Sequence, residues 1–126
     1  MTPNGRKPTD AELAILRVLW VRGPSTVRQV AETMDREVGY TTVLKLLQIM
    51  TEKGLVARDE SARTHIYSAA FTEDQTQRQL VNDLVERAFD GSAAKLVLQA
   101  LASKQATPEE LEEIRRLLNK SRGGSR

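Results

Sequence analysis

Residues 39–54 read GYTTVLKLLQIMTEKG and predict a single helix with a glycine at each end. Apolar residues recur in it at the spacing i, i+3, i+4 and i+7, so they form one buried stripe. The stripe consists of Val43, Leu46, Leu47 and Met50. The same periodicity places polar residues on the opposite side of the helix. They are Thr41, Lys45, Gln48 and Glu52, with Thr42 and Ile49 along one edge and Leu44 along the other.

The polar side of this helix carries mostly short hydroxyl, amide and cationic groups. A helix with such a face fits the major groove of DNA, and its amino end favours phosphate. The alternative is an ordinary solvent-exposed helix face, which this stretch alone leaves open. The segments on either side of the helix help to distinguish the two.

Two shorter helices are predicted before residue 39. A capping box at Thr9 and Glu12 begins the first, which runs to about Val21. A second capping box, at Thr26 and Gln29, begins the next helix. Two short helices followed by a third with a polar face are typical of a helix-turn-helix.

After Gly54 the hydrophobic period changes from that of a helix to that of a strand. Residues 55–58 and 65–68 predict two short strands joined by the polar turn 59–64. Three helices followed by a hairpin make a winged helix, and Arg63 is the cation at the tip of this predicted wing. The predicted fold class is therefore mainly α with a small β-hairpin, beginning with a winged helix-turn-helix.

Residues after 70 carry only helical patterns, with predicted starts at Thr72, near residue 93 and at Thr107. We expect the first of these helices to have a buried stripe. Its members are Leu80, Val81, Leu84, Val85 and Ala88. The middle helix is apolar on every side, so it needs cover on every side. We therefore expect the three helices to form a dimerisation region.

The predicted dimer interface is entirely aliphatic. It consists of Leu80, Leu84, Leu96, Val97, Leu98, Leu101, Leu111, Ile114, Leu117 and Leu118. The alternative is that these helices pack back on the N-terminal part and form one monomeric globule. The expected organisation is a disordered arm at 1–8, a DNA-binding domain at 9–70, a dimerisation domain at 71–120 and a disordered tail at 121–126.

Composition excludes several kinds of site. The 126 residues include no cysteine and one histidine, which excludes disulfides, thiolate metal sites and cysteine nucleophiles. We therefore expect no metal, no cofactor and no enzymatic activity, and we interpret the paired acids within 109–113 as a solvent-exposed helix face. The net charge of +2 permits nucleic-acid binding without indicating it.

The chain is expected to be cytoplasmic and to have no membrane partner. No apolar run in it reaches the roughly 18 residues that a membrane span requires. Residues 1–9 are too polar and too short for a signal peptide.

Five segments occur in an order that resembles a known family. They are Ala11-Glu12-Leu13 with Val18-Leu19-Trp20, Thr42-Val43 with Leu46-Leu47, Lys53-Gly54-Leu55, Ala62-Arg63 with Tyr67, and Leu111-Glu112-Glu113-Ile114. Together they resemble the penicillinase-repressor (BlaI/MecI) family of bacterial winged-helix transcription regulators. The likeness spans most of the chain.

The resemblance implies a homodimeric repressor that covers a dyad-symmetric operator in double-stranded DNA. It implies that the third helix reads bases and that the wing holds the backbone. By position, the family's base-reading side chains fall on Thr41, Thr42 and Lys45, and its wing arginine falls on Arg63. The remaining predicted DNA-binding residues are Gln48, Tyr40 and Arg28.

The resemblance also implies an upstream sensor or protease as a further partner. In the best-known relatives, cleavage at an Asn-Phe bond in the dimerisation region releases the repressor. That position aligns with Gln99-Ala100 in this chain, so the likeness does not extend to the cleavage site.

Two other function classes stay open. One is a winged-helix module whose third helix binds a protein, against which the cation-bearing face and Arg63 argue. The other is a regulator that senses a small molecule in an aromatic pocket between its domains. The chain has few aromatic residues to line such a pocket.

Overall fold

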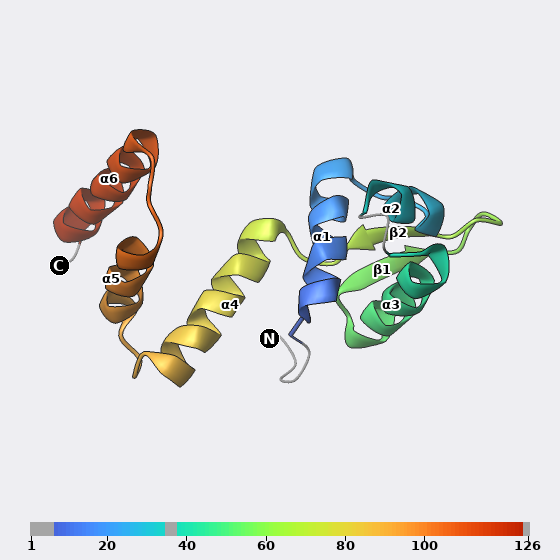
Figure 1. Cartoon of the computed structure of the whole chain (residues 1–126), viewed down its shortest axis with the longest axis horizontal. Helices are drawn as coiled ribbons and strands as arrows, with labels where there is room; N and C mark the ends of the chain where they lie inside the picture. The colour runs from blue at the N-terminus through green and yellow to red at the C-terminus, as the bar shows by residue number, and fades with distance from the viewer. Residues whose placement is uncertain (1–6, 35–37, 125–126) are drawn as a thin grey trace. The chain divides into compact units, whose positions relative to one another are not determined.

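The computed structural model describes residues 7–34 and 38–124. Its helices and strands follow one another in the order shown in Figure 1. They are α1 (Asp10–Arg22), α2 (Val27–Thr33), α3 (Tyr40–Lys53), β1 (Val56–Asp59), β2 (Ile66–Ala69), α4 (Glu73–Ala88), α5 (Ala93–Ser103) and α6 (Pro108–Gly124). This order confirms the predicted fold class, a mainly helical chain with a small β-hairpin.

The chain divides into two compact units, residues 1–81 and 82–126. Helix α4 contributes residues to both units. The functional domains that we expect at 9–70 and 71–120 stay predictions. None of the helices in the described ranges combines the length and the apolar composition needed to cross a bilayer.

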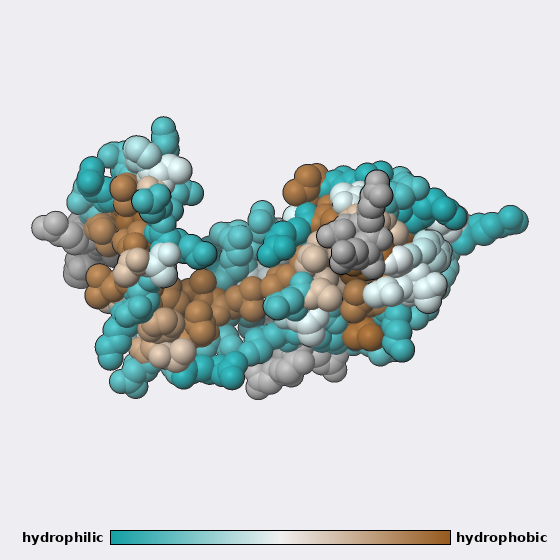
Figure 2. Space-filling model, viewed as in Figure 1, coloured by the Kyte–Doolittle hydropathy of each residue, from teal (hydrophilic) through white to brown (hydrophobic). Residues whose placement is uncertain are grey.

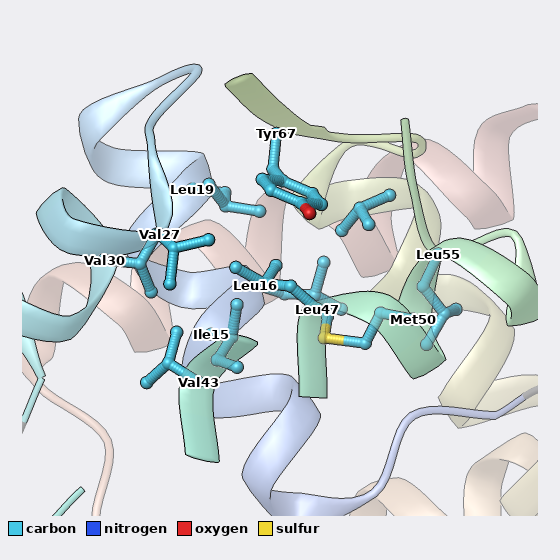
Figure 3. Close-up of a cluster of buried hydrophobic side chains, with 11 residues drawn as sticks. Ile15, Leu16, Leu19, Val27, Val30, Val43, Leu47, Met50, Leu55 and Tyr67 are labelled. Carbon is cyan, nitrogen blue, oxygen red and sulfur yellow. The ribbon is translucent and has the colours of Figure 1, made fainter. Parts of the chain in front are cut away.

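The core of the first unit lies where α1, α2, α3 and the hairpin meet (Figure 3). Every one of these elements contributes at least one buried side chain. The buried cluster consists of Ile15, Leu16, Leu19, Val27, Val30, Val43, Leu47, Met50, Leu55, Val56 and Tyr67. Burying one such large apolar side chain contributes roughly 1.5–3 kcal/mol, so this cluster holds α3 firmly against its neighbours.

The strands β1 and β2 pair antiparallel, from Val56 opposite Ala69 to Asp59 opposite Ile66. Both strands begin and end one residue later than predicted, and the predicted hairpin is confirmed. Ser25 and Tyr67 also exchange two backbone hydrogen bonds, with N to O distances of 2.9 and 2.8 Å. This single-residue bridge ties the segment before α2 to the wing. The sequence did not predict it, because one extended residue carries no periodic signal.

Capping boxes begin four of the helices at the threonines expected to start them. The threonine hydroxyl accepts from the backbone amide three residues on, and that residue's side chain accepts from the threonine amide. The pairs are Thr9 with Glu12, Thr26 with Gln29, Thr72 with Gln75, and Thr107 with Glu110. Helix α3 ends at Gly54, whose φ of 80° lies in the left-handed region that favours glycine.

Both ends of the described chain have defined local structure. Lys7 and Pro8 are half-buried, and the Lys53 ammonium donates a 3.1 Å hydrogen bond to the Lys7 carbonyl. Helix α6 runs to Gly124, beyond its predicted end at residue 120. The disordered arm and tail stay predictions.

The predicted buried stripe of α4 is wrong for the single chain. Only Val85 is buried, Leu80 is half-buried, and Val81, Leu84 and Ala88 are exposed. The pattern itself is helical as predicted, but none of the described elements covers most of this side of α4.

The second unit leaves its apolar residues on the surface as well. No residue of α5 is buried. Figure 2 shows hydrophobic surface over α5 and α6 at the left of the view. A hollow of about 270 Å³ between these helices is lined only by apolar side chains. They are Leu96, Val97, Ala100, Leu101, Ile114, Leu117 and Leu118.

Candidate nucleic-acid interface

Helix α3 has one side in the core and the other in solvent, as its periodicity predicts. Val43, Leu47 and Met50 are completely buried, and Leu46 is half-buried. The predicted base-reading side chains, Thr41, Thr42 and Lys45, all lie on the exposed part. Gln48, from the wider DNA-binding set, is exposed there as well. Hydroxyl, ammonium and amide groups are the donors and acceptors that read base edges in a major groove.

The amino end of α3 differs from those of the capped helices. Its N-cap is Gly39, which provides no side-chain hydrogen bond to the first turn. The first amides of a helix have no partner within it, so those of α3 remain available to an acceptor from outside. A helix end of this kind suits a phosphate oxygen, which would lie close to the exposed hydroxyls of Thr41 and Thr42.

Arg28 and Tyr40 come together at the same end of α3. The Arg28 guanidinium carbon lies 5.8 Å from the centre of the Tyr40 ring, in a cation–π contact between α2 and the first residue of α3. Both side chains are exposed. The sequence placed both residues in the DNA-binding set but did not predict their contact, which depends on how α2 packs against α3.

The wing carries two arginines, Arg58 in β1 and Arg63 in the loop between β1 and β2. Arg58 lies 2.6 Å from the Glu60 carboxylate, and its hydrogen bonds to Tyr67 and Glu60 raise the pKa of its guanidinium. Arg63 is exposed and takes part in none of the ion pairs found within residues 7–34 and 38–124. Arg63 is therefore the wing cation with its charge available to a phosphate.

A turn within the same loop is fixed by Asp59. Its carboxylate accepts a 2.9 Å hydrogen bond from the Ser61 amide, and hydrogen bonds from the Ser61 backbone and hydroxyl lower the pKa of Asp59. A hydrogen-bonded turn at the start of the loop limits the paths that the chain can take toward Arg63.

A nearly buried ion pair lies at the other end of α3, and the sequence did not predict it. The Lys53 ammonium is 2.7 Å from the Glu12 carboxylate, whose side chain is only 3% exposed. The same carboxylate oxygen accepts from the Thr9 amide at 2.9 Å. The pair joins the start of α1 to the end of α3. Its two members lie 41 residues apart, so no local pattern could reveal it.

The predicted dimer-interface residues are only partly covered within one chain. Leu80, Leu96 and Ile114 are half-buried. The others are exposed: Leu84, Val97, Leu98, Leu101, Leu111, Leu117 and Leu118. Among the described residues, no group of three or more His, Cys, Asp or Glu side chains is arranged to hold a metal ion.

Three helices, a core-facing hairpin and an exposed polar face on the third helix define a winged-helix protein of the kind that regulates transcription. The crystal structure of YusO from Bacillus subtilis shares this fold, with a TM-score of 0.51 and 21% identity over 96% of this chain and 79% of that one. The sequence model of the penicillinase repressor family matches residues 8–120. The chain belongs to this family, as the resemblance predicted.

Individual relatives match over nearly the whole chain. The transcriptional regulator BlaI of Mycobacterium tuberculosis is 31% identical over 118 residues, which cover 91% of this chain and 85% of that protein. The penicillinase repressor of Staphylococcus aureus is 22% identical, over 86% of this chain and 88% of that protein. The methicillin resistance regulatory protein MecI of Mammaliicoccus sciuri is 21% identical, over 89% and 93%. These proteins are transcriptional regulators and not enzymes.

Proposed function

We propose that this protein is a homodimeric transcriptional repressor that binds a dyad-symmetric operator in double-stranded DNA. Helix α3 enters the major groove, and the wing contacts the backbone through Arg63. One observation carries the proposal. The side of α3 away from the core exposes Thr41, Thr42, Lys45 and Gln48 together. The relatives named as repressors add support from an independent direction.

The way in which α3 is held against the core supports a role in base reading. Three of its side chains are completely buried in a core to which all the neighbouring elements contribute. A helix held in this way keeps its exposed groups in fixed relative positions, which direct readout of base edges requires. A flexible segment would instead bind more weakly, because part of the binding free energy would be spent on ordering it.

Dimerisation through the second unit is the second part of the proposal. Exposed aliphatic residues of this number are unusual on a monomer and mark a surface that another chain covers. Leu98, 68% exposed, and Leu117, 66% exposed, are the most exposed leucines of this surface. A two-fold dimer presents two copies of α3 and so matches a palindromic site.

The proposal is tested by selecting duplexes from a random pool with the purified full-length chain. The expected result is a selected sequence with two inverted half-sites, protected from cleavage in a footprint over both halves. Sedimentation of the complex should give two chains for each duplex. Selected sequences without dyad symmetry, or an absence of any selected sequence at moderate salt, would refute operator binding and favour the protein-binding module.

A further inference from the structure

The start of α4 is attached to the winged helix by two hydrogen bonds. The Trp20 indole N–H donates to the Phe71 carbonyl at 3.0 Å, across 51 residues of sequence. The Ala70 amide donates to the Leu55 carbonyl at 2.9 Å. Together they hold two consecutive residues of the link between β2 and α4.

The Trp20 bond satisfies a carbonyl that α4 itself leaves unpaired. The first hydrogen bond within the helix runs from the Thr76 amide to the Thr72 carbonyl, one residue after Phe71. The Phe71 carbonyl therefore lies just outside the helix, where the indole N–H takes the place of water as its donor. The indole N–H is the one polar group of the Trp20 side chain, and it can only donate. This hydrogen bond therefore satisfies it.

Residues of the first turns of α4 face the winged helix at the same place. The side chains of Leu55, Phe71 and Leu80 line a small cavity of about 50 Å³ together with Lys7 and Pro8. The Lys7 carbonyl is itself held by Lys53. All of these residues belong to the first compact unit.

We propose that Trp20 sets the direction in which α4 leaves the winged helix, and thereby the half-site separation that the dimer accepts. This inference rests on the proposed function. Helix α4 runs without interruption from Glu73 to Ala88 and passes from the first compact unit into the second. Because a continuous helix is stiff, an orientation fixed at Phe71 is carried along it. Trp20 is thus a positioning residue and touches no DNA.

A fixed direction of α4 has a consequence for DNA binding. Two recognition helices held at one separation match one spacing of half-sites on the duplex. If the attachment at Phe71 is loosened, the dimer loses this preference, because each winged helix then samples many orientations. The affinity of one winged helix for one half-site does not depend on the attachment.

The test uses full-length chains and duplexes that carry the selected half-sites at the selected spacing, or with one or two base pairs added or removed. The unchanged protein is expected to prefer one spacing by about tenfold or more, as linked sites do when only one geometry allows both to bind. Trp20→Phe keeps an aromatic ring and removes the donor. It is expected to reduce this preference to about threefold or less, with unchanged affinity for a duplex with one half-site.

A second variant removes only the hydrogen bond. The sequence contains one tryptophan, so benzothienylalanine, which has sulfur in place of the indole nitrogen, can be incorporated at position 20 alone. It should give the same flattened spacing profile as Trp20→Phe. Val21→Ala is the matched control, since Val21 is the next residue of α1 and is 90% exposed. It should keep the spacing preference of the unchanged protein.

The outcomes separate this inference from the proposed function. Two outcomes would overturn the inference alone: a spacing preference that survives in both Trp20 variants, or a loss of affinity for a single half-site, which would make Trp20 a support of the winged helix itself. Failure of the unchanged protein to bind any two-half-site duplex would refute the proposed function, and this inference with it.

Discussion

Lys45 lies on the exposed side of α3, one helical turn after Thr41 and Thr42. Its ammonium has the reach and charge to donate to base acceptors in a major groove. We predict that Lys45→Ala weakens binding to the selected operator by about 1–3 kcal/mol, the usual value of one lost base contact. Affinity for random duplex should change much less. Titrations of both duplexes at one salt concentration measure the two effects.

Lys104→Ala is the control for this prediction. It removes the same charge from an exposed residue between α5 and α6, far along the chain from the recognition helix. It should leave operator binding unchanged. An equal loss of affinity for operator and random duplex in Lys45→Ala would mean that Lys45 contacts phosphate and reads no base.

Arg63 is the exposed arginine of the wing. If it neutralises one phosphate, Arg63→Ala should weaken binding to all duplexes alike. The slope of log K against log salt should then fall in magnitude by about 0.9, the value for one released counterion. Binding titrations between low and moderate salt give the slope. Arg17→Ala, an exposed arginine of α1, should leave it unchanged, and an unaltered slope in Arg63→Ala would show that the wing arginine stays in solvent.

At the scale of elements, the Glu12–Lys53 pair joins α1 to α3. Lys53→Met would leave the Glu12 carboxylate buried without its cation, and such unpaired buried charges destabilise strongly. We predict a loss of about 3 kcal/mol in the free energy of unfolding of the first unit. Urea denaturation at neutral pH, followed by the fluorescence of Trp20, measures it.

A double variant shows whether the buried charge is the cause. Glu12→Leu with Lys53→Met removes both charges and should recover much of the lost stability, because an apolar pair of similar size costs no desolvation. Part of the loss should persist, since Thr9 also loses the side chain that caps its amide. If Lys53→Met is as stable as the unchanged protein, water takes the place of the Lys53 ammonium beside the Glu12 carboxylate.

The elements of the fold were largely predictable, and the contacts between them were not. The helical period and the terminal glycines fix α3 and its exposed side locally, so the positions of Thr42 and Lys45 followed from the sequence. The Glu12–Lys53 pair and the Trp20 contact with Phe71 depend on how distant elements pack. The exposure of Leu84 was missed because periodicity identifies an apolar face without identifying what covers it.

At the scale of the whole molecule, the exposed aliphatic surface of α5 and α6 carries the proposed dimer. Leu98→Asp would place a carboxylate without a partner in that interface, at a cost of several kcal/mol. We predict that the variant sediments as a monomer at micromolar concentration. Its operator affinity should fall by roughly 10² to 10⁴-fold, the usual range for losing linked binding.

Val21→Asp is the matched control, because it adds the same charge at another highly exposed apolar residue, in the first unit. It should sediment as a dimer and bind the operator normally. Dimers that persist in Leu98→Asp would place the interface elsewhere. If the unchanged protein also sediments as a monomer, the exposed aliphatic surface must bind a different partner.

The bridge between Ser25 and Tyr67 also bears on the order in which the protein forms during synthesis. A chain leaves the ribosome amino end first, so α1, α2 and α3 emerge before the strand that carries Tyr67. Until that strand arrives, Ser25 lacks its two backbone partners and the shared core lacks Tyr67, its largest fully buried side chain. Helix α3 is therefore translated before the core against which it packs is complete. We expect the proposed DNA binding to arise in a nascent chain only after the wing has been made.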